Sequence, residues 1–275
     1  MLWVPHTNAE PEDKKPKHIM RKIICIANQK GGVGKTTTAV NLAACLAVAE
    51  KKTLLIDCDS QGNATSGMGI DKRQIADKNL YHALIGKIPL REAVTPTQIP
   101  HLDLIPSNQD LIGIEVEFIR LPEREKRLRT FLRQMDVSYD YVILDCPPSL
   151  GFLTINALTA SDSLMVPLQC EYFAMEGLGQ LMNTLKLVQN RLNPSLTLGG
   201  ILLTMFDSRN TLSHRVSEDI RKHFGSRVFQ TVIPRNVRLS ESPSHGLPII
   251  LYDIRSRGAM SYMELTREFM NCGRI

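Results

Sequence analysis

The sequence predicts an α/β protein with a doubly wound, mostly parallel sheet flanked by helices. Short, continuous apolar runs recur along the chain, and such runs are typical of strands that are buried on both faces of a sheet. The segments between them are long enough for the crossover helices that parallel strands require. These expected strands lie near Lys22, Thr53, Leu102, Tyr141, Ser163, Gly199 and Val228.

The N-terminal residues differ from the rest of the chain. Residues 1–19 contain three prolines, mixed charges and little hydrophobic pattern, which predicts a disordered extension ahead of a single domain over residues 20–275. Met20 is either the biological start or an internal methionine. About twenty residues cannot bury the core of a helix-turn-helix domain, so sequence-specific operator binding is not expected.

A glycine-rich loop follows the first expected strand and leads into an expected helix from Thr36 to Ala49. Its glycines let consecutive main-chain N–H groups face a phosphate at the positive end of that helix. Lys35 would reach the β- and γ-phosphates of a nucleotide, and the Thr36 hydroxyl would bind Mg²⁺. The loop consists of Lys30, Gly31, Gly32, Val33, Gly34, Lys35, Thr36 and Thr37.

This loop departs from the ordinary phosphate-binding pattern at two positions. The usual motif begins with a glycine where Gln29 stands, and it needs no second lysine where Lys30 stands. The alternative interpretation is a glycine-rich strand-to-helix turn with surface lysines. The strand, the helix and the two hydroxyls in register favour a phosphate-binding loop, and Lys30 points to an ATPase that works as a dimer.

Carboxylates follow two further expected strands. Asp57 and Asp59 end the strand that begins at Thr53, and Asp145 ends the strand that begins at Tyr141. Because ligands of open parallel sheets sit at the carboxyl ends of the strands, these side chains can converge on the glycine-rich loop. They suit two tasks, holding the waters around Mg²⁺ and orienting an attacking water. A single aspartate after a strand is as often a helix cap or turn former, but three beside this loop favour a nucleotide site.

The composition is that of a compact enzyme. With 275 residues, 43% of them hydrophobic, the chain can bury a full core. It has no run of eighteen apolar residues and no apolar region typical of a secretory signal, so a cytoplasmic location is expected. The six cysteines are scattered without a C-x-x-C spacing. We interpret them as buried small hydrophobes rather than as metal ligands or disulfides.

Five segments carry a family resemblance: KGGVGKTT, IDCDSQGNATSG from Ile56, YDYVILDCPPSLGFLTINAL from Tyr139, PLQCEYFAMEGL from Pro167 and VIPRNVRLSESPSHG from Val232. Together they resemble the ParA/Soj chromosome-partitioning ATPases. These belong to the P-loop group with a deviant Walker A motif, which also contains MinD and the nitrogenase iron protein. The similarity extends from about residue 20 almost to the C-terminus.

The resemblance implies roles for individual residues. Lys30 would be the signature lysine, which reaches across a dimer interface to the phosphates of the partner's ATP, as an arginine finger does. Asp59 would position the hydrolytic water, Asp145 would be the switch II carboxylate near magnesium, and Pro234 with Asn236 would hold the adenine. The expected catalytic residues are therefore Lys30, Lys35 and Asp59, and the expected metal-site residues are Thr36, Asp59 and Asp145.

The resemblance also implies an activity and its partners. The chain would bind ATP and Mg²⁺, form an ATP-sandwich homodimer and coat the nucleoid by binding double-stranded DNA without sequence preference. A ParB-like centromere-binding protein would stimulate slow hydrolysis and so release the dimer. The output would be the segregation of a chromosome or a plasmid.

Basic residues are concentrated in one part of the sequence. The whole chain has 33 Lys and Arg against 28 Asp and Glu, which decides nothing by itself. Between residues 201 and 257, however, nine basic residues stand against five acidic ones. Within this stretch, Arg209 and Arg238 match arginines implicated in DNA binding by Soj-type relatives. We favour a patch that binds DNA phosphates, and an ordinary solvated surface is the alternative.

Three other functions need different sequence features. A MinD-like membrane ATPase needs a basic amphipathic C-terminal helix, but residues 262–275 carry two Glu and two Arg, so stable membrane anchoring is not expected. An iron-protein-like reductase needs a cysteine a few residues past Asp145, where Phe152 stands. An ATPase that positions a cargo other than DNA stays open, because a partner protein selects the cargo.

Overall fold

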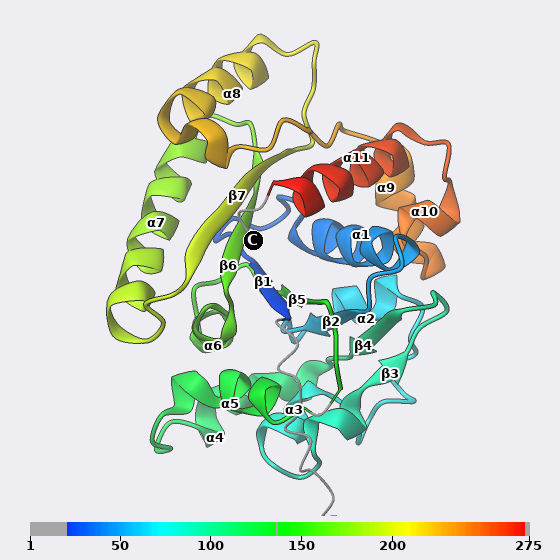
Figure 1. The fold of residues 1–275 in the computed structure, drawn as a ribbon, viewed down its shortest axis with the longest axis vertical. Helices are drawn as coiled ribbons and strands as arrows, with labels where there is room; N and C mark the ends of the chain where they lie inside the picture. Colours follow the sequence, from blue (N-terminus) through cyan, green and yellow to red (C-terminus); the bar gives the residue numbers. More distant parts are fainter. Residues whose placement is uncertain (1–20, 136, 273–275) are drawn as a thin grey trace, which may run out of the picture.

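The computed structural model describes residues 21–135 and 137–272 (Figure 1). The expected disordered extension over residues 1–19 lies outside the described residues. The strands are β1 (Lys22–Ile26), β2 (Thr53–Asp57), β3 (Thr95–Pro96), β4 (Leu102–Ile105), β5 (Tyr141–Asp145), β6 (Ser163–Gln169) and β7 (Thr197–Thr204).

These strands form one seven-stranded sheet in the order β3-β4-β2-β5-β1-β6-β7. Every neighbouring pair is parallel except β3 and β4, which are antiparallel. The chain therefore winds from β1 toward one edge of the sheet and returns through β5 to the other edge. The predicted doubly wound, mostly parallel sheet is confirmed.

Two details of the strand prediction were wrong. The segment near Val228 is not a strand, because Val228 makes only an isolated bridge to Ile201. Its apolar residues are buried for packing instead: the Phe229 ring lies over Gly200, where an added Cβ would come within 2.4 Å of it. The edge strand β3 was missed because it spans two residues and ends in a proline, which cannot donate to a ladder.

The expected helix after the glycine-rich loop is α1 (Lys35–Val48). The other α-helices are α2 (Asn63–Gly67), α3 (Leu80–Leu84), α4 (Ile114–Glu117), α5 (Arg127–Arg133), α6 (Phe152–Ala160), α7 (Ala174–Arg191), α8 (Thr211–Phe224), α9 (Val237–Glu241), α10 (Ile249–Tyr252) and α11 (Arg257–Asn271). Short 3₁₀ turns are η1 (Leu90–Ala93), η2 (Gln109–Gly113), η3 (Arg124–Lys126), η4 (Gly225–Arg227) and η5 (Ser242–His245).

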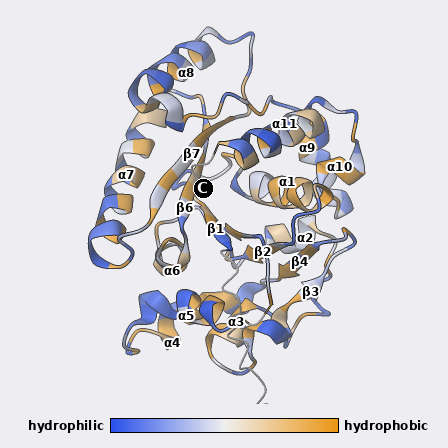
Figure 2. Ribbon diagram, in the orientation of Figure 1, coloured by the Kyte–Doolittle hydropathy of each residue, from blue (hydrophilic) through white to orange (hydrophobic). Residues whose placement is uncertain are grey.

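The helices cover both faces of the sheet and enclose two hydrophobic cores (Figure 1). Alternate side chains of β1 enter different cores: Cys25 packs with α5, α6 and α7, whereas Ile24 and Ile26 pack with α1 and α11. Figure 2 shows apolar residues along the central strands and polar residues on the outer sides of α7 and α8. This alternation is what a sheet buried on both faces requires.

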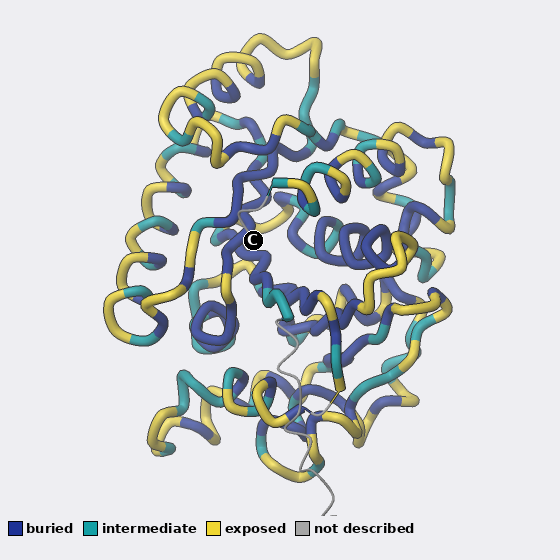
Figure 3. The backbone as a smooth tube through the Cα atoms, in the orientation of Figure 1, coloured by how far each residue is buried: buried dark blue, intermediate teal, exposed yellow. Residues whose placement is uncertain are grey.

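Helix α1 lies deep in the molecule, and eleven of its fourteen residues are buried (Figure 3). Its many Ala and Thr side chains are small, so α11 can pack closely on one side of α1 and the sheet on the other. The hydroxyls of Thr38 and Tyr262 meet at 3.2 Å between α1 and α11. The start of α1 is thereby held rigidly at the carboxyl edge of the sheet.

The carboxyl ends of the central strands meet at this edge. The register pairs Asp145 of β5 with Ile26 of β1 on one side and with Asp57 of β2 on the other. The loop that follows β1 therefore begins beside Asp145, and Asp57 lies one strand further along the same edge. Among the described residues, we find no helix with the length and apolar character needed to cross a membrane.

Candidate functional site

The loop between β1 and α1 has the backbone of a phosphate-binding turn. Gly32 and Gly34 have φ values of 72° and 84°, in the left-handed region that favours glycine. An added Cβ at Gly32 would meet no atom within 4 Å, so conformation and not crowding requires glycine there. Gly34 caps α1, and the first N–H groups of this fourteen-residue helix lack intrahelical partners. Such a helix start attracts anions.

Two side chains at the carboxyl edge of the sheet anchor this loop, and the sequence analysis missed both. The hydroxyl of Thr204, at the end of β7, donates a 2.8 Å hydrogen bond to the carbonyl of Val33. The Asn28 amide donates to the Pro167 carbonyl at 2.8 Å, and its oxygen accepts from the Lys30 N–H at 3.1 Å. A signal was present, because Thr204 is a polar residue at the last position of a buried apolar strand and Asn28 is a polar residue two positions beyond one.

The two lysines of the loop lie in different surroundings. Lys35 is buried, lines the cavity described below, and donates a 3.0 Å hydrogen bond from Nζ to the Lys30 carbonyl. Burial lowers the pKa of Lys35, while the charges of Asp145 and Asp59 act in the opposite direction. The Lys30 side chain is about half exposed and forms an ion pair with Glu171. It does not line the cavity of its own chain.

Asp57 has a structural task. Its Oδ2 accepts hydrogen bonds from the Thr65 N–H at 2.8 Å and the Thr65 hydroxyl at 2.7 Å, and its Oδ1 accepts from the Asp59 N–H at 3.1 Å. Burial raises the pKa of Asp57 to about 6, although these three donors favour its charged form. Asp57 thus ties α2 to the end of β2. Asp59 is also buried, but it lines the cavity.

Asp145 is buried with neither carboxylate oxygen hydrogen-bonded to the described residues. Burial, followed by the charge of Asp57, raises the pKa of Asp145 well above its usual range. The neighbouring Thr36 hydroxyl and Lys35 act in the opposite direction, but Thr36 does not reach hydrogen-bonding geometry. A buried carboxylate without a partner is costly, and a cation beside it would remove that cost.

This donor set fits a hydrated magnesium ion. The described residues contain no cluster of three or more His, Cys, Asp or Glu side chains that could hold a metal ion by themselves. Mg²⁺ usually keeps several waters and uses only one or two carboxylates together with the phosphates of a substrate. The Thr36 hydroxyl, the orphaned Asp145 and the nearby Asp59 provide such a partial set.

An open cavity of about 770 Å³ lies over the loop. Its lining includes the start of α1, Asp59 and the segment after β7 that contains Pro234 and Asn236. The Phe206 N–H donates to the Ile233 carbonyl at 3.0 Å, which fixes that segment against the end of β7. The candidate residues that line the cavity are Gly32, Gly34, Lys35, Thr36, Thr37, Asp59, Pro234 and Asn236.

Asn236 has a second task that limits how it can contact a ligand. Its Oδ1 caps α9 by accepting a 3.2 Å hydrogen bond from the Leu239 N–H. The amide nitrogen is therefore the part of Asn236 that is available to a base. Of the remaining candidates, Gly31 and Val33 belong to the loop without lining the cavity, and the buried Asp145 lies outside its lining.

Comparisons with known proteins agree on one family. A family model described as an AAA domain matches residues 21–198. The chromosome partitioning protein ParA of Myxococcus xanthus is 57% identical over 90% of this chain and 88% of its own. The sporulation initiation inhibitor protein Soj of Bacillus subtilis is 55% identical over 90% and 98%. This chain belongs to the ParA/Soj family.

Two further findings concern this ParA/Soj fold and its chemistry. A relative from Treponema pallidum, the chromosome-partitioning ATPase Soj, is 48% identical over 91% of this chain and 98% of its own. The crystal structure of cobyrinic acid a,c-diamide synthase from Mycobacterium smegmatis with bound ADP and magnesium superposes with a TM-score of 0.80. It is 36% identical and covers 93% of this chain and 98% of that one.

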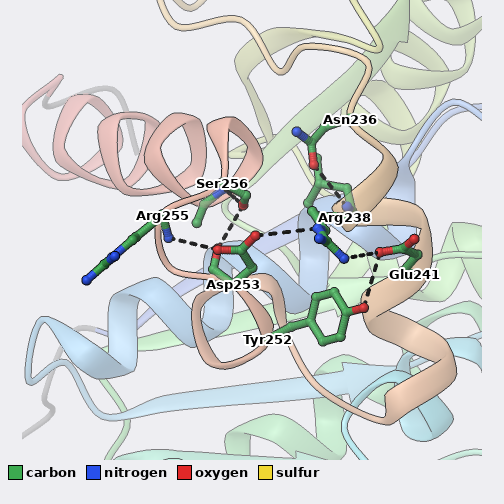
Figure 4. A network of polar contacts seen from close by, with 9 residues as sticks. Asn236, Arg238, Glu241, Tyr252, Asp253, Arg255 and Ser256 are labelled. Carbon is green, nitrogen blue, oxygen red and sulfur yellow. Dashed lines mark hydrogen bonds and ion pairs between the residues drawn. The ribbon is translucent and has the colours of Figure 1, made fainter.

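In this ParA/Soj chain, the two arginines expected to bind DNA are already paired with carboxylates. Arg209 contacts Asp207 with Nε at 3.1 Å and Nη2 at 3.0 Å, and this pairing lowers the pKa of Asp207 to about 2. Arg238 pairs with Glu241 at 3.0 Å and lies 3.6 Å from Asp253 (Figure 4). A phosphate would have to compete with these partners.

Proposed function

We propose that this chain is an ATP hydrolase that acts as a DNA-partitioning switch. Binding of ATP with Mg²⁺ drives formation of a sandwich homodimer, and the dimer binds double-stranded DNA without sequence preference. A ParB-like centromere-binding partner stimulates slow hydrolysis and releases the dimer from the nucleoid. The family membership and the names of close relatives support the partitioning role.

The lining of the cavity suits a nucleoside triphosphate. The N–H groups at the start of α1 and the Lys35 ammonium would hold the phosphates, because both carry positive charge at the same place. Pro234 would pack against the base, and the Asn236 amide would donate a hydrogen bond to it. The volume of about 770 Å³, with a lining that includes both the loop and the segment around Pro234 and Asn236, supports ATP over a smaller anion.

The acidic residues divide the remaining work. When bound, Mg²⁺ would neutralise charge on the phosphate oxygens. Thr36 and Asp145 would hold the ion and its waters, since Asp145 has no other hydrogen-bond partner among the described residues. Asp59 lines the cavity, and its Oδ1 accepts a 2.9 Å hydrogen bond from the Gln61 N–H, which fixes the carboxylate. A carboxylate held in this way can orient a water molecule.

One observation carries the dimer proposal. Lys35 lines the cavity of its own chain, but Lys30, five residues earlier in the same loop, directs its ammonium outside that cavity to Glu171. The main chain of Lys30 is fixed at both ends, by Asn28 and by the Lys35 ammonium. The Lys30 ammonium is therefore at the surface, where a second chain can receive it in exchange for Glu171.

The proposed DNA surface is partly neutralised by acidic neighbours. Arg209 and Arg238 each lose part of their effective charge to Asp207 and Glu241. A dimer compensates because it pairs the two patches and doubles the number of phosphate contacts. Binding should then be strongly dependent on ATP and on salt.

Co-sedimentation tests the output of the switch. The Asp59→Ala variant, locked with ATP and Mg²⁺, is mixed with unrelated DNA duplexes or with anionic liposomes. We expect pelleting with DNA of any sequence and not with liposomes, and the same locked protein should capture a ParB-like protein from its own cells. Pelleting with liposomes alone would contradict the proposal and favour a membrane ATPase. If the locked protein binds DNA but captures a different partner protein, the ATP-dependent switch is supported and the proposed cargo is wrong.

A further inference from the structure

Glu171 occupies the short connection between β6 and α7, directly beside the phosphate-binding loop. The Lys30 ammonium donates a hydrogen bond to Oε2 of Glu171, and the two side chains form an ion pair. The Glu171 main chain is fixed by two turns, Glu171 N–H to the Gln169 carbonyl at 2.9 Å and Ala174 N–H to the Glu171 carbonyl at 3.0 Å. Both partners of the ion pair thus project from fixed backbone, and only their side chains can move.

The pair lies at the surface. The Lys30 and Glu171 side chains are 48% and 43% exposed, so water and ions reach both charges. Pairs of this kind stabilise weakly and can be exchanged for a better partner. The triphosphate of ATP carries several negative charges where Glu171 carries one, so phosphates can outcompete this carboxylate for one ammonium.

The residues next to Glu171 form an apolar surface. Tyr172 and Phe173 are 76% and 67% exposed, and their rings meet edge to face with centroids 5.0 Å apart. Among the described residues, they are the only aromatic side chains in the set of exposed large hydrophobic residues. An exposed aromatic pair of this kind is typical of a surface that another protein covers.

We propose that Glu171 is a latch that holds Lys30 within its own chain and thereby opposes dimerisation. We assign the adjoining Tyr172–Phe173 surface to a second copy of this chain. These two residues directly follow Glu171, the ion-pair partner of Lys30, and in the proposed dimer Lys30 binds the partner's nucleotide. This inference rests on the proposed ATP-sandwich dimer. One ammonium cannot serve Glu171 and the partner's phosphates at once, so the latch must open in both chains when the dimer forms.

Removing the latch should change the dimer dissociation constant by a measurable amount. Exposed ion pairs contribute little, and two of them open per dimer, so removing the Glu171 charge should tighten the dimer roughly 3- to 30-fold. Glu171→Gln keeps the size and a hydrogen-bond acceptor but removes the charge. Glu176→Gln is the matched control, because Glu176 is an exposed glutamate in the first turn of α7 without an ion pair among the described residues.

Sedimentation velocity with Mg²⁺ and a non-hydrolysable ATP analogue gives the dimer dissociation constant of each protein. We expect Glu171→Gln to be tighter than wild type and Glu176→Gln to equal wild type. The advantage of Glu171→Gln should shrink as salt rises, because salt weakens the wild-type latch. Equal constants for Glu171→Gln and wild type, or a weaker dimer in Glu171→Gln, would overturn the latch.

A second variant tests the occupant of the apolar surface. In Tyr172→Ser/Phe173→Ser, nucleotide binding to the monomer should be unchanged while the dimer weakens at least tenfold. An unchanged dimer would overturn the assignment of this surface to a second copy. A wild-type protein that stays monomeric with the analogue would overturn the sandwich dimer and the latch together. A wild-type dimer with no shift in Glu171→Gln would overturn the latch alone.

Discussion

Asp57 and Asp145 are register partners on the adjacent strands β2 and β5, but only Asp57 has hydrogen-bond donors for its carboxylate. Thr65 satisfies Asp57 with its N–H and its hydroxyl, whereas Asp145 has no such partner among the described residues. Two neighbouring carboxylates thus lie in different surroundings. The first ties α2 to β2, and the second has no hydrogen-bond partner among the described residues, as the proposed cation site requires.

This difference predicts that magnesium binding releases a proton. Burial and the charge of Asp57 raise the pKa of Asp145 in the free protein. A bound cation favours the carboxylate and lowers that pKa, so protons leave at any pH between the lowered and raised values. Calorimetry of Mg·ATP binding in buffers of different ionisation heat should show release of up to about one proton per site. Asp145→Asn should lose this component, and equal release in both proteins would contradict the assignment.

Asp59 should matter for hydrolysis and not for binding. Because the proposed role of Asp59 is to orient water rather than phosphate, Asp59→Ala should bind ATP and dimerise normally but hydrolyse ATP at least about 100-fold more slowly. Single-turnover phosphate release, measured beside nucleotide affinity, separates the two effects. Near-normal turnover would move the water-positioning role to another carboxylate.

Thr204 should support the loop from beneath. Thr204→Val keeps the side-chain shape but removes the donor to the buried Val33 carbonyl. An unsatisfied buried acceptor costs about 1–3 kcal/mol, so the free energy of unfolding should fall by that amount in a denaturant titration. ATP affinity should fall as well, because the loop loses its anchor. Unchanged stability with unchanged affinity would show that the hydrogen bond contributes nothing.

The arginine pairings make a prediction about DNA with an internal control. Arg209→Ala should weaken binding to unrelated duplexes equally and reduce the salt slope by about two per dimer, since each lost phosphate contact removes about 0.9. Arg238→Ala should act in the same direction. Asp207→Asn should tighten binding, because it frees Arg209 from its carboxylate.

Arg73 provides the matched control for these variants. It contacts Asp71, two residues earlier, with the same Nε and Nη2 geometry that Arg209 uses toward Asp207. Arg73→Ala should leave DNA affinity unchanged. If Arg73→Ala and Arg209→Ala weaken DNA binding equally, the surface around Arg209 is ordinary solvated surface.

Much of this molecule could be predicted from local sequence. Buried parallel strands have continuous apolar runs, and two loop glycines have positive φ, so the central strands and the position of the glycine-rich turn were predicted correctly. The segment at Val228 was wrongly predicted as a strand, because burial alone selects apolar residues, whether or not the segment forms strand hydrogen bonds. The loop anchors Asn28 and Thr204 were missed because their position at a strand end shows only that they are polar, and their acceptors are main-chain carbonyls, which no residue type reveals.

The sequence also could not predict which charged groups pair with each other. Lys30 and Glu171 are 141 residues apart, so only the adjacency of β1 and β6 brings them together. Similarly, the net charge between residues 201 and 257 did not indicate that Arg209 and Arg238 are held by acidic neighbours. Counting residues gives the excess of positive charge, but the fold determines how much of that charge is free to bind phosphate.

The most direct test of the dimer is light scattering of Lys30→Ala with ATP and Mg²⁺, in the same samples used for nucleotide titration. Lys30 lies outside the cavity of its own chain, so the variant should bind ATP with nearly wild-type affinity yet stay monomeric. Lys35→Ala, which alters the cavity itself, should lose nucleotide binding. Wild type should dimerise under these conditions. A normal ATP-dependent dimer of Lys30→Ala would contradict the account.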